Sequence, residues 1–185
     1  MTKNFLRTWI IAAGLCAVPG LAQATEHFML IQSPAVPGDS TAKGHENWIR
    51  VSSFDWNVVA ASSWTSTGGA SVGKPNPGKM VLTLPTGVWS PLFLRLITQG
   101  KALPKVVVDA TATDGRPLYR MTIEGFFVTG YRLASETTTP IPQDHLEGVF
   151  KTVKLEYYAT AADGRLITTT VDWNISTGVS SPPAF

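Results

Sequence analysis

The sequence contains few of the residues on which most protein chemistry depends. Cys16 is its only cysteine, which excludes a disulfide framework and a cluster of thiolate metal ligands. Charged residues make up only 15% of the 185 residues, and the basic ones form no cluster that could follow a phosphate backbone. We therefore expect a fold that is held together by packing and that does not bind nucleic acid.

Residues that could form an active site are also scarce. His27, His45 and His145 lie far apart and lack the spacing of zinc ligands such as H-E-x-x-H. No serine stands in a Gly-x-Ser-x-Gly nucleophile motif, and no glycine-rich loop with phosphate-binding order leads into a helix. The histidines are expected at the surface or in turns. The sequence predicts no catalytic residue, no metal site and no cofactor. The acidic residues are scattered, so a pair of catalytic carboxylates would have to be assembled across strands.

The one long apolar stretch lies near the N-terminus and has the features of an export signal. Lys3 and Arg7 precede an apolar run over residues 9–21, and Ala22-Gln23-Ala24 has the small-x-small pattern of a cleavage site. This run is too short to span a bilayer. We predict cleavage after Ala24, a protein in the periplasm or outside the cell, and no stable membrane anchor. Without Lys3 and Arg7, basic and acidic residues are equal in number, so the mature chain is formally neutral.

From Thr25 on, apolar and polar residues alternate in many short segments. The remaining ~160 residues are enough for a single domain with its own core. Two similar turns, each with an Asp-Gly pair at residues 114–115 and 163–164, lie between β-branched and aromatic segments and predict two antiparallel hairpins. Residues 28–31 and 79–85 predict further strands. These patterns are typical of a mainly β domain.

A single segment, residues 91–99, predicts a helix. Ser90 can cap the free amide groups of its first turn, and Pro91 suits the first helical position. Gly100 can end the helix in the left-handed conformation. Each end of the segment therefore carries the residue types that are typical of a helix boundary.

This helix is too short to be stable alone, so its apolar face must pack on a sheet. The face consists of Leu92, Phe93, Leu96 and Ile97. Trp89 is expected to pack on Leu94 ahead of the first turn. The predicted fold class is therefore mainly β, an antiparallel β-barrel or sandwich with one short packed α-helix.

Three segments are expected to lack regular structure. Residues 60–78 are rich in Ser, Thr, Gly and Pro, and they predict a long exposed loop. Residues 134–143 are polar and contain two prolines, and residues 178–185 are expected to fray. Trp64 stands in the first of these loops, where an aromatic side chain can either contact a partner or fold back onto its own domain.

The most specific passage lies between Gly38 and Trp56. A Gly-Asp-Ser turn is followed by a histidine and by an apolar-x-Val-x-Ser-Phe-x-Trp segment, which predicts one strand centred on Val51. This order of residues resembles the start of the Hcp proteins, the haemolysin-coregulated tube subunits of type VI secretion systems. The resemblance is carried by Gly38, Ser40, His45, Val51, Ser53, Phe54 and Trp56. It continues through the helix and hairpins and covers essentially the whole mature chain.

The resemblance implies a secreted structural protein that is not an enzyme and that forms hexameric rings. Such rings stack into a tube that can carry effectors and meet the type VI spike. In such a stack, the loop over residues 60–78 with Trp64 and Lys74 is expected to contact the neighbouring ring, because it is polar, rich in glycine and bracketed by strands. Tube subunits of the family assemble in the cytoplasm without a signal peptide, so we expect this chain to form a ring apart from the cytoplasmic tube. The alternative is a periplasmic or extracellular ligand-binding module on an Hcp-like barrel.

Overall fold

The computed structural model describes residues 24–64, 69–135 and 141–184. The predicted signal peptide therefore lies outside the described residues, apart from Ala24. The strands are β1 (Thr25–Ile31), β2 (Ile49–Val51), β3 (Ser53–Asp55), β4 (Val58–Val59), β5 (Ser62–Trp64), β6 (Ala70–Val72), β7 (Asn76–Pro77), β8 (Met80–Pro85), β9 (Ala102–Ala112), β10 (Pro117–Ala134), β11 (Gln143–Val149), β12 (Thr152–Thr160), β13 (Leu166–Asn174) and β14 (Val179–Ser180). The described residues contain a single helix, α1 (Ser90–Gln99). The predicted mainly β fold class is confirmed.

The strands close into a barrel around one core. β10 is the longest strand and pairs with β9 along one edge, while its other edge pairs first with β12 and then with β11. β1 adds to β9, and β8 adds to β11. The segment from β2 to β3 closes the remaining gap, because β2 pairs with β1 and β3 pairs with β8. Of the two predicted architectures, the structure is therefore the barrel.

The predicted single strand around Val51 is in fact two strands. Ser52 separates β2 from β3, and its amide donates a hydrogen bond to the carbonyl oxygen of Thr83 on β8 at 2.8 Å. The chain changes its pairing partner at this point, from β1 to β8, in order to close the barrel. The sequence pattern does not mark the break, because Val51 and Phe54 supply apolar residues on both sides of it.

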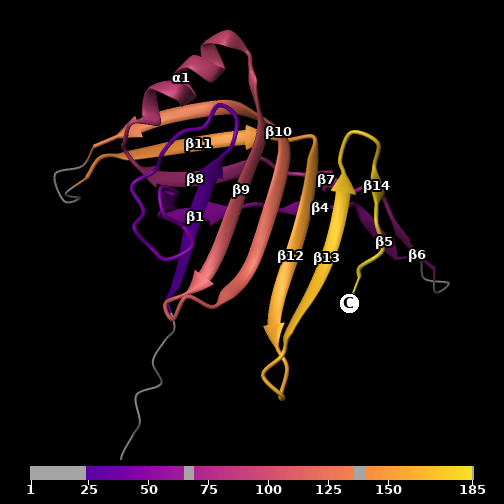
Figure 1. Cartoon of the computed structure of the whole chain (residues 1–185). Helices are drawn as coiled ribbons and strands as arrows, with labels where there is room; N and C mark the ends of the chain where they lie inside the picture. The colour runs from indigo at the N-terminus through magenta and orange to yellow at the C-terminus, as the bar shows by residue number, and fades with distance from the viewer. Residues whose placement is uncertain (1–23, 65–68, 136–140, 185) are drawn as a thin grey trace, which may run out of the picture.

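Both predicted Asp-Gly hairpins are present. Gly115 joins β9 to β10 with φ 82°, and Gly164 joins β12 to β13 with φ 83°, a region that favours glycine. In Figure 1, β9, β10, β12 and β13 stand side by side, and β8 and β11 cross behind them below α1. β12, β13 and β14 extend the sheet from β10 beyond the barrel. We call this extension the wing.

Apolar side chains from the barrel strands fill the interior. The buried set includes Met29, Ile31, Ile49, Val51, Met80, Leu82, Leu84, Val106, Val108, Met121, Ile123 and Leu146. α1 packs on this core with Phe93 and Leu96 buried and with Leu92 and Ile97 half-buried, as its apolar face predicts. Burying one large apolar side chain stabilises a fold by roughly 1.5–3 kcal/mol, so the helix is stable only in this packed position.

The ends of α1 follow the prediction in part. Pro91 lies in the first turn, and Gly100 ends the helix with φ 60°. Ser90 does not cap it, because Trp89 occupies the N-cap position and no side chain caps the helix there. The predicted contact between Trp89 and Leu94 is also wrong, since Trp89 is buried while Leu94 is 52% exposed.

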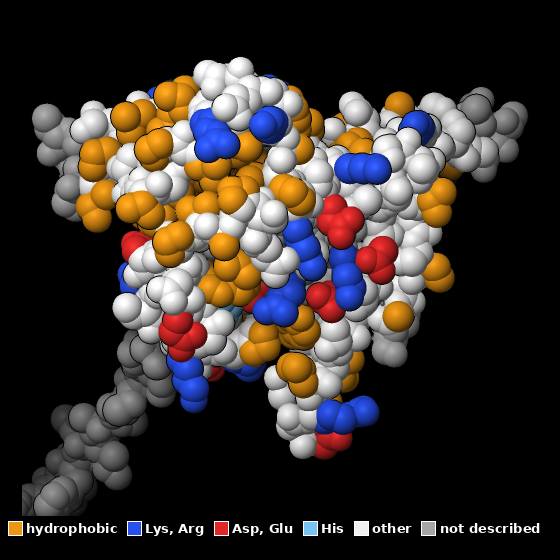
Figure 2. Space-filling view, turned by 45° about the horizontal axis from the view of Figure 1, so that its top comes forward, with side chains coloured by type: hydrophobic (Ala, Val, Ile, Leu, Met, Phe, Trp, Pro, Cys, Tyr) orange, Lys and Arg blue, Asp and Glu red, His pale blue; other side chains and the backbone are white. Residues whose placement is uncertain are grey.

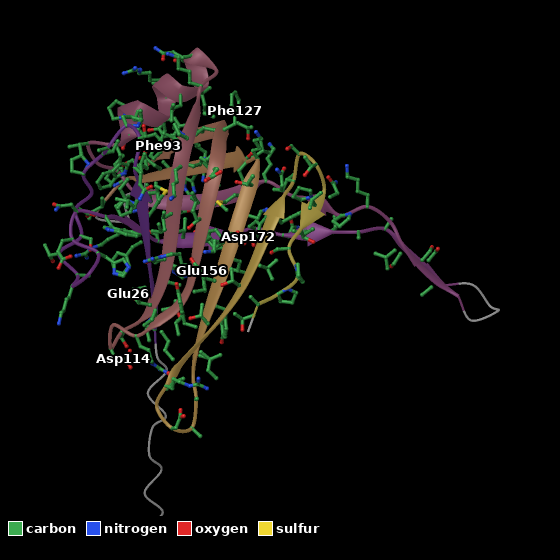
Figure 3. The ribbon with its side chains drawn as sticks, turned by 45° about the vertical axis from the view of Figure 1, so that its right-hand side comes forward. Glu26, Phe93, Asp114, Phe127, Glu156 and Asp172 are labelled. Atoms are coloured by element: carbon green, nitrogen blue, oxygen red, sulfur yellow. The ribbon has the colours of Figure 1, made fainter. Side chains whose placement is uncertain are left out.

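The predicted loop over residues 60–78 forms part of a two-stranded arm. β4 pairs with β7 and β5 pairs with β6, so the segment has regular structure, although its exposure is as predicted. Figure 3 shows this segment projecting from the body of the molecule. We call residues 58–77 the arm. The sequence does not predict it because each strand has only two or three residues, and the Ser, Asn, Gly and Pro in and between these strands are typical of turns.

The C-terminal segment is not frayed over its described part. β14 pairs with β13, and Ala184 forms a further bridge to Thr170. Of the predicted polar loop over residues 134–143, residues 136–140 lie outside the described part of the chain. Across the described ranges, none of the helical structure is long and apolar enough to cross a membrane.

Candidate interaction surfaces

The motif residues Gly38 and Ser40 shape a loop that lies on the barrel wall. We call residues 32–48 the anchored loop. The Ser40 amide donates to the Trp48 carbonyl at 3.0 Å, and the Ser40 hydroxyl accepts a hydrogen bond from the Ala42 amide at 3.1 Å. A Cβ atom on Gly38 would lie 2.0 Å from the carbonyl carbon of Trp48. Only glycine permits this approach of the two chain segments.

His45 joins the anchored loop to a buried carboxylate on β9. Its Nε2 lies 3.0 Å from Oδ2 of Asp109, and its ring stacks on Phe28 of β1 with 4.5 Å between centroids. The side chains of His45 and Asp109 are 12% and 7% exposed. His45 lies in a turn, one of the two predicted placements, because its amide donates to the Ala42 carbonyl at 2.9 Å. Its side chain is largely covered and links the loop to the barrel, so it is not a surface histidine.

Arg120 on β10 completes the cluster around Asp109. Its Nε donates to Oδ1 at 2.7 Å and its Nη2 donates to Oδ2 at 2.6 Å, which is the two-bond geometry of a strong arginine–carboxylate pair. These hydrogen bonds raise the pKa of Arg120 above its ordinary value, so it stays charged. Sequence reasoning missed Asp109. The available signal was a lone acid that directly follows three valines in a strand.

The other motif residues serve to close the barrel. Val51 is buried in the core, Phe54 is half-buried, and Ser53 is exposed on β3. Trp56 packs on Phe150, with ring centroids 5.3 Å apart. The motif residues thus lie in the region where the barrel closes, and they do not line an open site.

The remaining histidines lie in strands and not in turns. His27 in β1 is half-buried, and burial lowers its pKa. His145 in β11 places Nδ1 3.2 Å from Oγ1 of Thr83. Among the described side chains, no group of three or more His, Cys, Asp and Glu residues could hold a metal ion.

Asp144 in β11 is a second buried carboxylate, and it contacts Ser90, the first residue of α1. Ser90 donates to its Oδ2 at 2.5 Å, and the hydroxyl of Tyr131 donates to its Oδ1 at 3.0 Å. Burial, together with the hydrogen bond to Asp144, raises the pKa of Tyr131 to about 12. A negative charge is also favourable near a helix N-terminus. Asp144 therefore ties α1 to β10 and β11, a link that the sequence did not reveal.

The arm carries the two residues that were expected to contact a neighbouring ring. Trp64 ends β5 opposite Ala70 of β6, and its side chain lies outside what the structure describes. Lys74 is exposed between β6 and β7. Three valines of the arm, Val58, Val59 and Val72, are 42%, 57% and 73% exposed. Each of its ladders has only two strands, and strands with free edges can pair with another chain.

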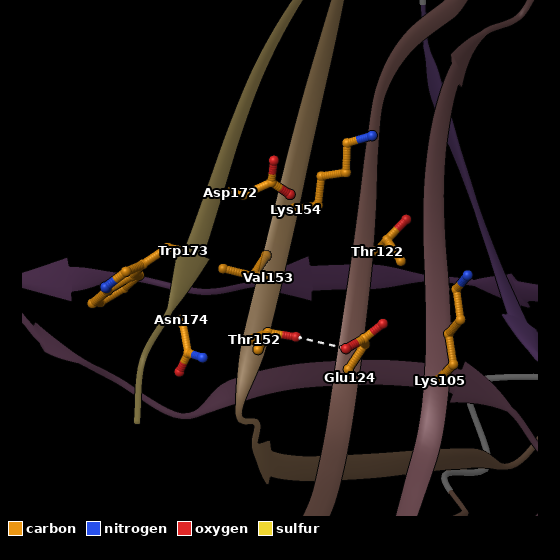
Figure 4. Close-up of a pocket in the computed structure, with 9 residues that line it drawn as sticks. All are labelled: Lys105, Thr122, Glu124, Thr152, Val153, Lys154, Asp172, Trp173 and Asn174. Carbon is orange, nitrogen blue, oxygen red and sulfur yellow. Dashed lines mark hydrogen bonds between the residues drawn. The ribbon is translucent and has the colours of Figure 1, made fainter. Parts of the chain in front are cut away.

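The outer face of β9, β10, β12 and β13 carries alternating charges. Lys105 lies opposite Glu124, and Lys154 lies opposite Asp172. Acidic and basic side chains are interspersed on the face that Figure 2 shows. A hollow of about 440 Å³ lies among them, and Figure 4 shows residues that line it. Because charges of both signs alternate, this face produces no field of one sign and suits hydrogen bonds with a polar partner better than binding of a polyanion.

Comparison with known proteins points to one family. The family described as "Type VI secretion system effector, Hcp" matches residues 28–160. No curated protein matches the chain in sequence.

Solved structures share the fold at low sequence identity. A type six secretion system protein superposes with a TM-score of 0.77 at 20% identity, covering 85% of this chain and 100% of the other. Hcp1 from Salmonella typhimurium gives 0.68 at 21% identity, covering 85% and 99%. A type VI secretion system effector from Yersinia pestis gives 0.63 at 16% identity, covering 80% and 99%. At these identities, the likeness concerns the fold alone.

Proposed function

Because the chain belongs to the Hcp family of type VI secretion system effectors, we propose that it is a structural protein of type VI secretion and not an enzyme. The observation that carries this proposal is the family match, which spans nearly the whole barrel. The buried polar clusters agree with it, since Asp109 and Asp144 are 5% and 0% exposed and join parts of the fold to one another. Neither carboxylate is placed to meet a substrate.

The proposed working unit is a hexameric ring. A barrel with a sheet that extends beyond it supplies surfaces that a single copy does not cover, and cyclic closure buries such surfaces. Native mass spectrometry of the chain from Thr25 tests this unit directly. A hexamer is expected. A strictly monomeric species at micromolar concentration would reject the ring and would favour the exported ligand-binding module.

In the proposed assembly, rings stack through the arm and can carry effectors. The arm is supported as the stacking element by its projection from the body and by the exposure of its valines and of Lys74. Trp64 and Lys74 would then contact the next ring. The type VI spike and secreted effectors are the further partners of this proposal.

Export with removal of residues 1–24 is part of the proposed function. The basic start, the apolar run and the Ala-x-Ala site occur together directly before the domain. β1 begins at Thr25, which pairs with Ala112, so the residues from 25 on form the barrel without the signal peptide. N-terminal sequencing of the protein from periplasmic and culture fractions should find Thr25 first. An intact Met1 terminus in the cytoplasm would instead indicate an ordinary tube subunit.

A further inference from the structure

One end of the barrel exposes apolar side chains around α1. Val88 precedes the helix and is 75% exposed, the highest value among the large apolar side chains that the structure describes. Leu94 on the outer side of the helix is 52% exposed. Leu133 of β10 and Ile141, which precedes β11, are 58% and 51% exposed. Single exposed apolar side chains are common on soluble proteins, whereas a patch of them marks a contact surface.

The turn before α1 brings Val88 and Ile141 together. The amide and the hydroxyl of Thr86 both donate to the carbonyl oxygen of Pro142, at 3.0 and 2.6 Å. Val88 lies two residues after Thr86, and Ile141 directly precedes Pro142. Two hydrogen bonds to one carbonyl oxygen therefore hold these two segments side by side ahead of the helix.

Leu133 belongs to the same patch because of the pairing of β10 with β11. It lies opposite Asp144, and residues that pair across two strands direct their side chains to the same side of a sheet. The Asp144 carboxylate accepts a hydrogen bond from Ser90, the first residue of α1. Leu133 therefore lies on the side of the sheet that carries the helix. We call Val88, Leu94, Leu133 and Ile141 the helix-end patch.

The exposed charge beside the helix-end patch is of one sign. Between Asp55 and Asp109 the chain has five basic residues and no acidic one. Two of the five, Arg95 and Lys101, are exposed on α1 and directly after it, and neither forms an ion pair with a described residue. Asp144 contacts the start of the helix but is 0% exposed. The surface around α1 is therefore both apolar and positively charged.

The figures show the same combination at a projecting end of the molecule. In Figure 2, hydrophobic and basic side chains gather in the upper part of the view, where α1 lies, and the acidic side chains appear lower. In Figure 1, α1 lies at one extremity of the molecule, and the turn of the wing between β12 and β13 lies at the other. The helix-end patch is thus carried on a convex end.

We propose that the α1 end of the protein binds reversibly to the surface of a membrane that contains anionic lipids. The helix-end patch enters the layer of lipid headgroups, and Arg95 and Lys101 lie against the lipid phosphates. The contact is peripheral, because four apolar side chains bury far less area than a helix that spans a bilayer. This inference goes beyond the proposed structural role and does not depend on ring formation.

The shape and charge of this end favour a lipid surface over a protein partner. Apolar side chains that stand out from a convex end can enter a fluid layer of headgroups, whereas a protein partner must offer a pocket of matching shape. The negative surface potential of anionic lipids attracts the basic side chains beside the patch. A second copy of this chain offers no such field, because the chain without residues 1–24 is formally neutral.

Co-sedimentation of the chain from Thr25 with lipid vesicles tests the contact. Vesicles of phosphatidylcholine and phosphatidylglycerol in equal amounts should bind the protein, and vesicles of phosphatidylcholine alone should bind it much more weakly. The double variant Arg95→Gln, Lys101→Gln should bind the anionic vesicles roughly thirtyfold more weakly, because each basic side chain near such a surface contributes about fivefold. Added salt should weaken the binding of the wild-type chain, since it screens exposed charges.

Two valines of nearly equal exposure provide a matched pair of variants. Val88 in the helix-end patch is 75% exposed and Val72 in the arm is 73% exposed, so Val88→Glu and Val72→Glu should both fold and both change the net charge equally. Val88→Glu should weaken binding to the anionic vesicles by roughly tenfold or more, since it removes an apolar contact and adds a repelled charge. Val72→Glu should bind like the wild-type chain. Circular dichroism checks the fold, and Leu94→Glu replaces Val88→Glu if that variant is unfolded.

The outcomes separate the membrane contact from the proposed ring. Absence of binding to the anionic vesicles at low salt, or equal loss of binding in Val88→Glu and Val72→Glu, would overturn the membrane contact. A Val88→Glu variant that binds vesicles normally but changes its oligomeric state in native mass spectrometry would also overturn it, because another copy would then cover the patch. The ring itself is decided by the mass of the wild-type chain, whatever the vesicles show.

Discussion

The anchored loop and the arm flank the β2–β3 segment in the chain, yet they are held in different ways. The anchored loop packs on β1 and β9 through His45, whose partner Asp109 is buried. The arm pairs its strands only with each other, and its described side chains are almost all exposed. Both segments are rich in Gly, Pro, Ser and Thr. The difference shows that a buried partner on the barrel, and not composition, decides whether such a segment belongs to the fold.

A substitution in the packed core of the barrel is expected to cause the largest loss of stability, larger than one in the anchored loop or in the arm. Leu96→Asp places a charge among buried side chains of α1 and should abolish soluble folded protein, because it costs several kcal/mol out of a total of roughly 5–15 kcal/mol. Leu94→Asp is the matched control, since Leu94 is 52% exposed on the same helix. Thermal melts of both variants check this. Wild-type melting of Leu96→Asp would contradict the packing of α1.

Replacing Arg120 should cause the next largest loss of stability. Arg120→Ala leaves the buried carboxylate of Asp109 with His45 as its remaining side-chain partner in the cluster, and we expect it to lower the free energy of unfolding by about 3 kcal/mol. Arg120→Lys keeps the charge but cannot form both hydrogen bonds, so it should lose less. Urea denaturation measures each value. Equal stability of wild type and Arg120→Ala would mean that the Arg120–Asp109 pair does not help to hold the anchored loop.

Removing His45 tests the anchored loop more locally. His45→Ala should cost about 1.5 kcal/mol, because a hydrogen bond to a charged group and a stacked ring are lost. Hydrogen exchange of residues 38–48 should accelerate by roughly tenfold, which corresponds to about 1.4 kcal/mol. Exchange in the arm serves as the internal control and should not change. Equal acceleration in both segments would show that they are coupled and would break the comparison.

The smallest effect on stability is expected in the arm. Trp64→Ala and Lys74→Ala should each change the free energy of unfolding by less than about 0.5 kcal/mol, because the strands of the arm pair only with each other and Lys74 is exposed. Ring formation should stay intact, while stacking of rings at high concentration weakens. Light scattering and electron microscopy measure the stacks. Loss of the ring in Trp64→Ala would place that residue in the core or in the lateral contact.

Local sequence chemistry predicted the parts of the fold that depend on neighbouring residues. Pro91 and Gly100 bound the helix, and the Asp-Gly turns at Gly115 and Gly164 join the two hairpins. The resemblance to the Hcp family is likewise confirmed by the family match. The break at Ser52 could not be predicted, because it depends on which of two distant strands accepts each half of the segment.

The predicted site residues show the same limit. Gly38, Ser40 and His45 are recognisable as a motif, but Asp109, the partner of His45, lies 64 residues further along the chain. No periodicity or turn signal connects positions so far apart. The contact roles of Trp64 and Lys74 remain predictions that only an assembly can test.

The sequence by itself determined the mainly β class, the single helix, the two hairpins and the motif, since each follows from backbone preferences and side chains within a few positions. Only the tertiary structure decided that His45 and Arg120 meet on Asp109, that β2 and β3 close the barrel, and that β12, β13 and β14 extend the sheet beyond it. These features need strands from distant parts of the chain. A carboxylate such as Asp109 can be buried only once those strands have brought it its partners.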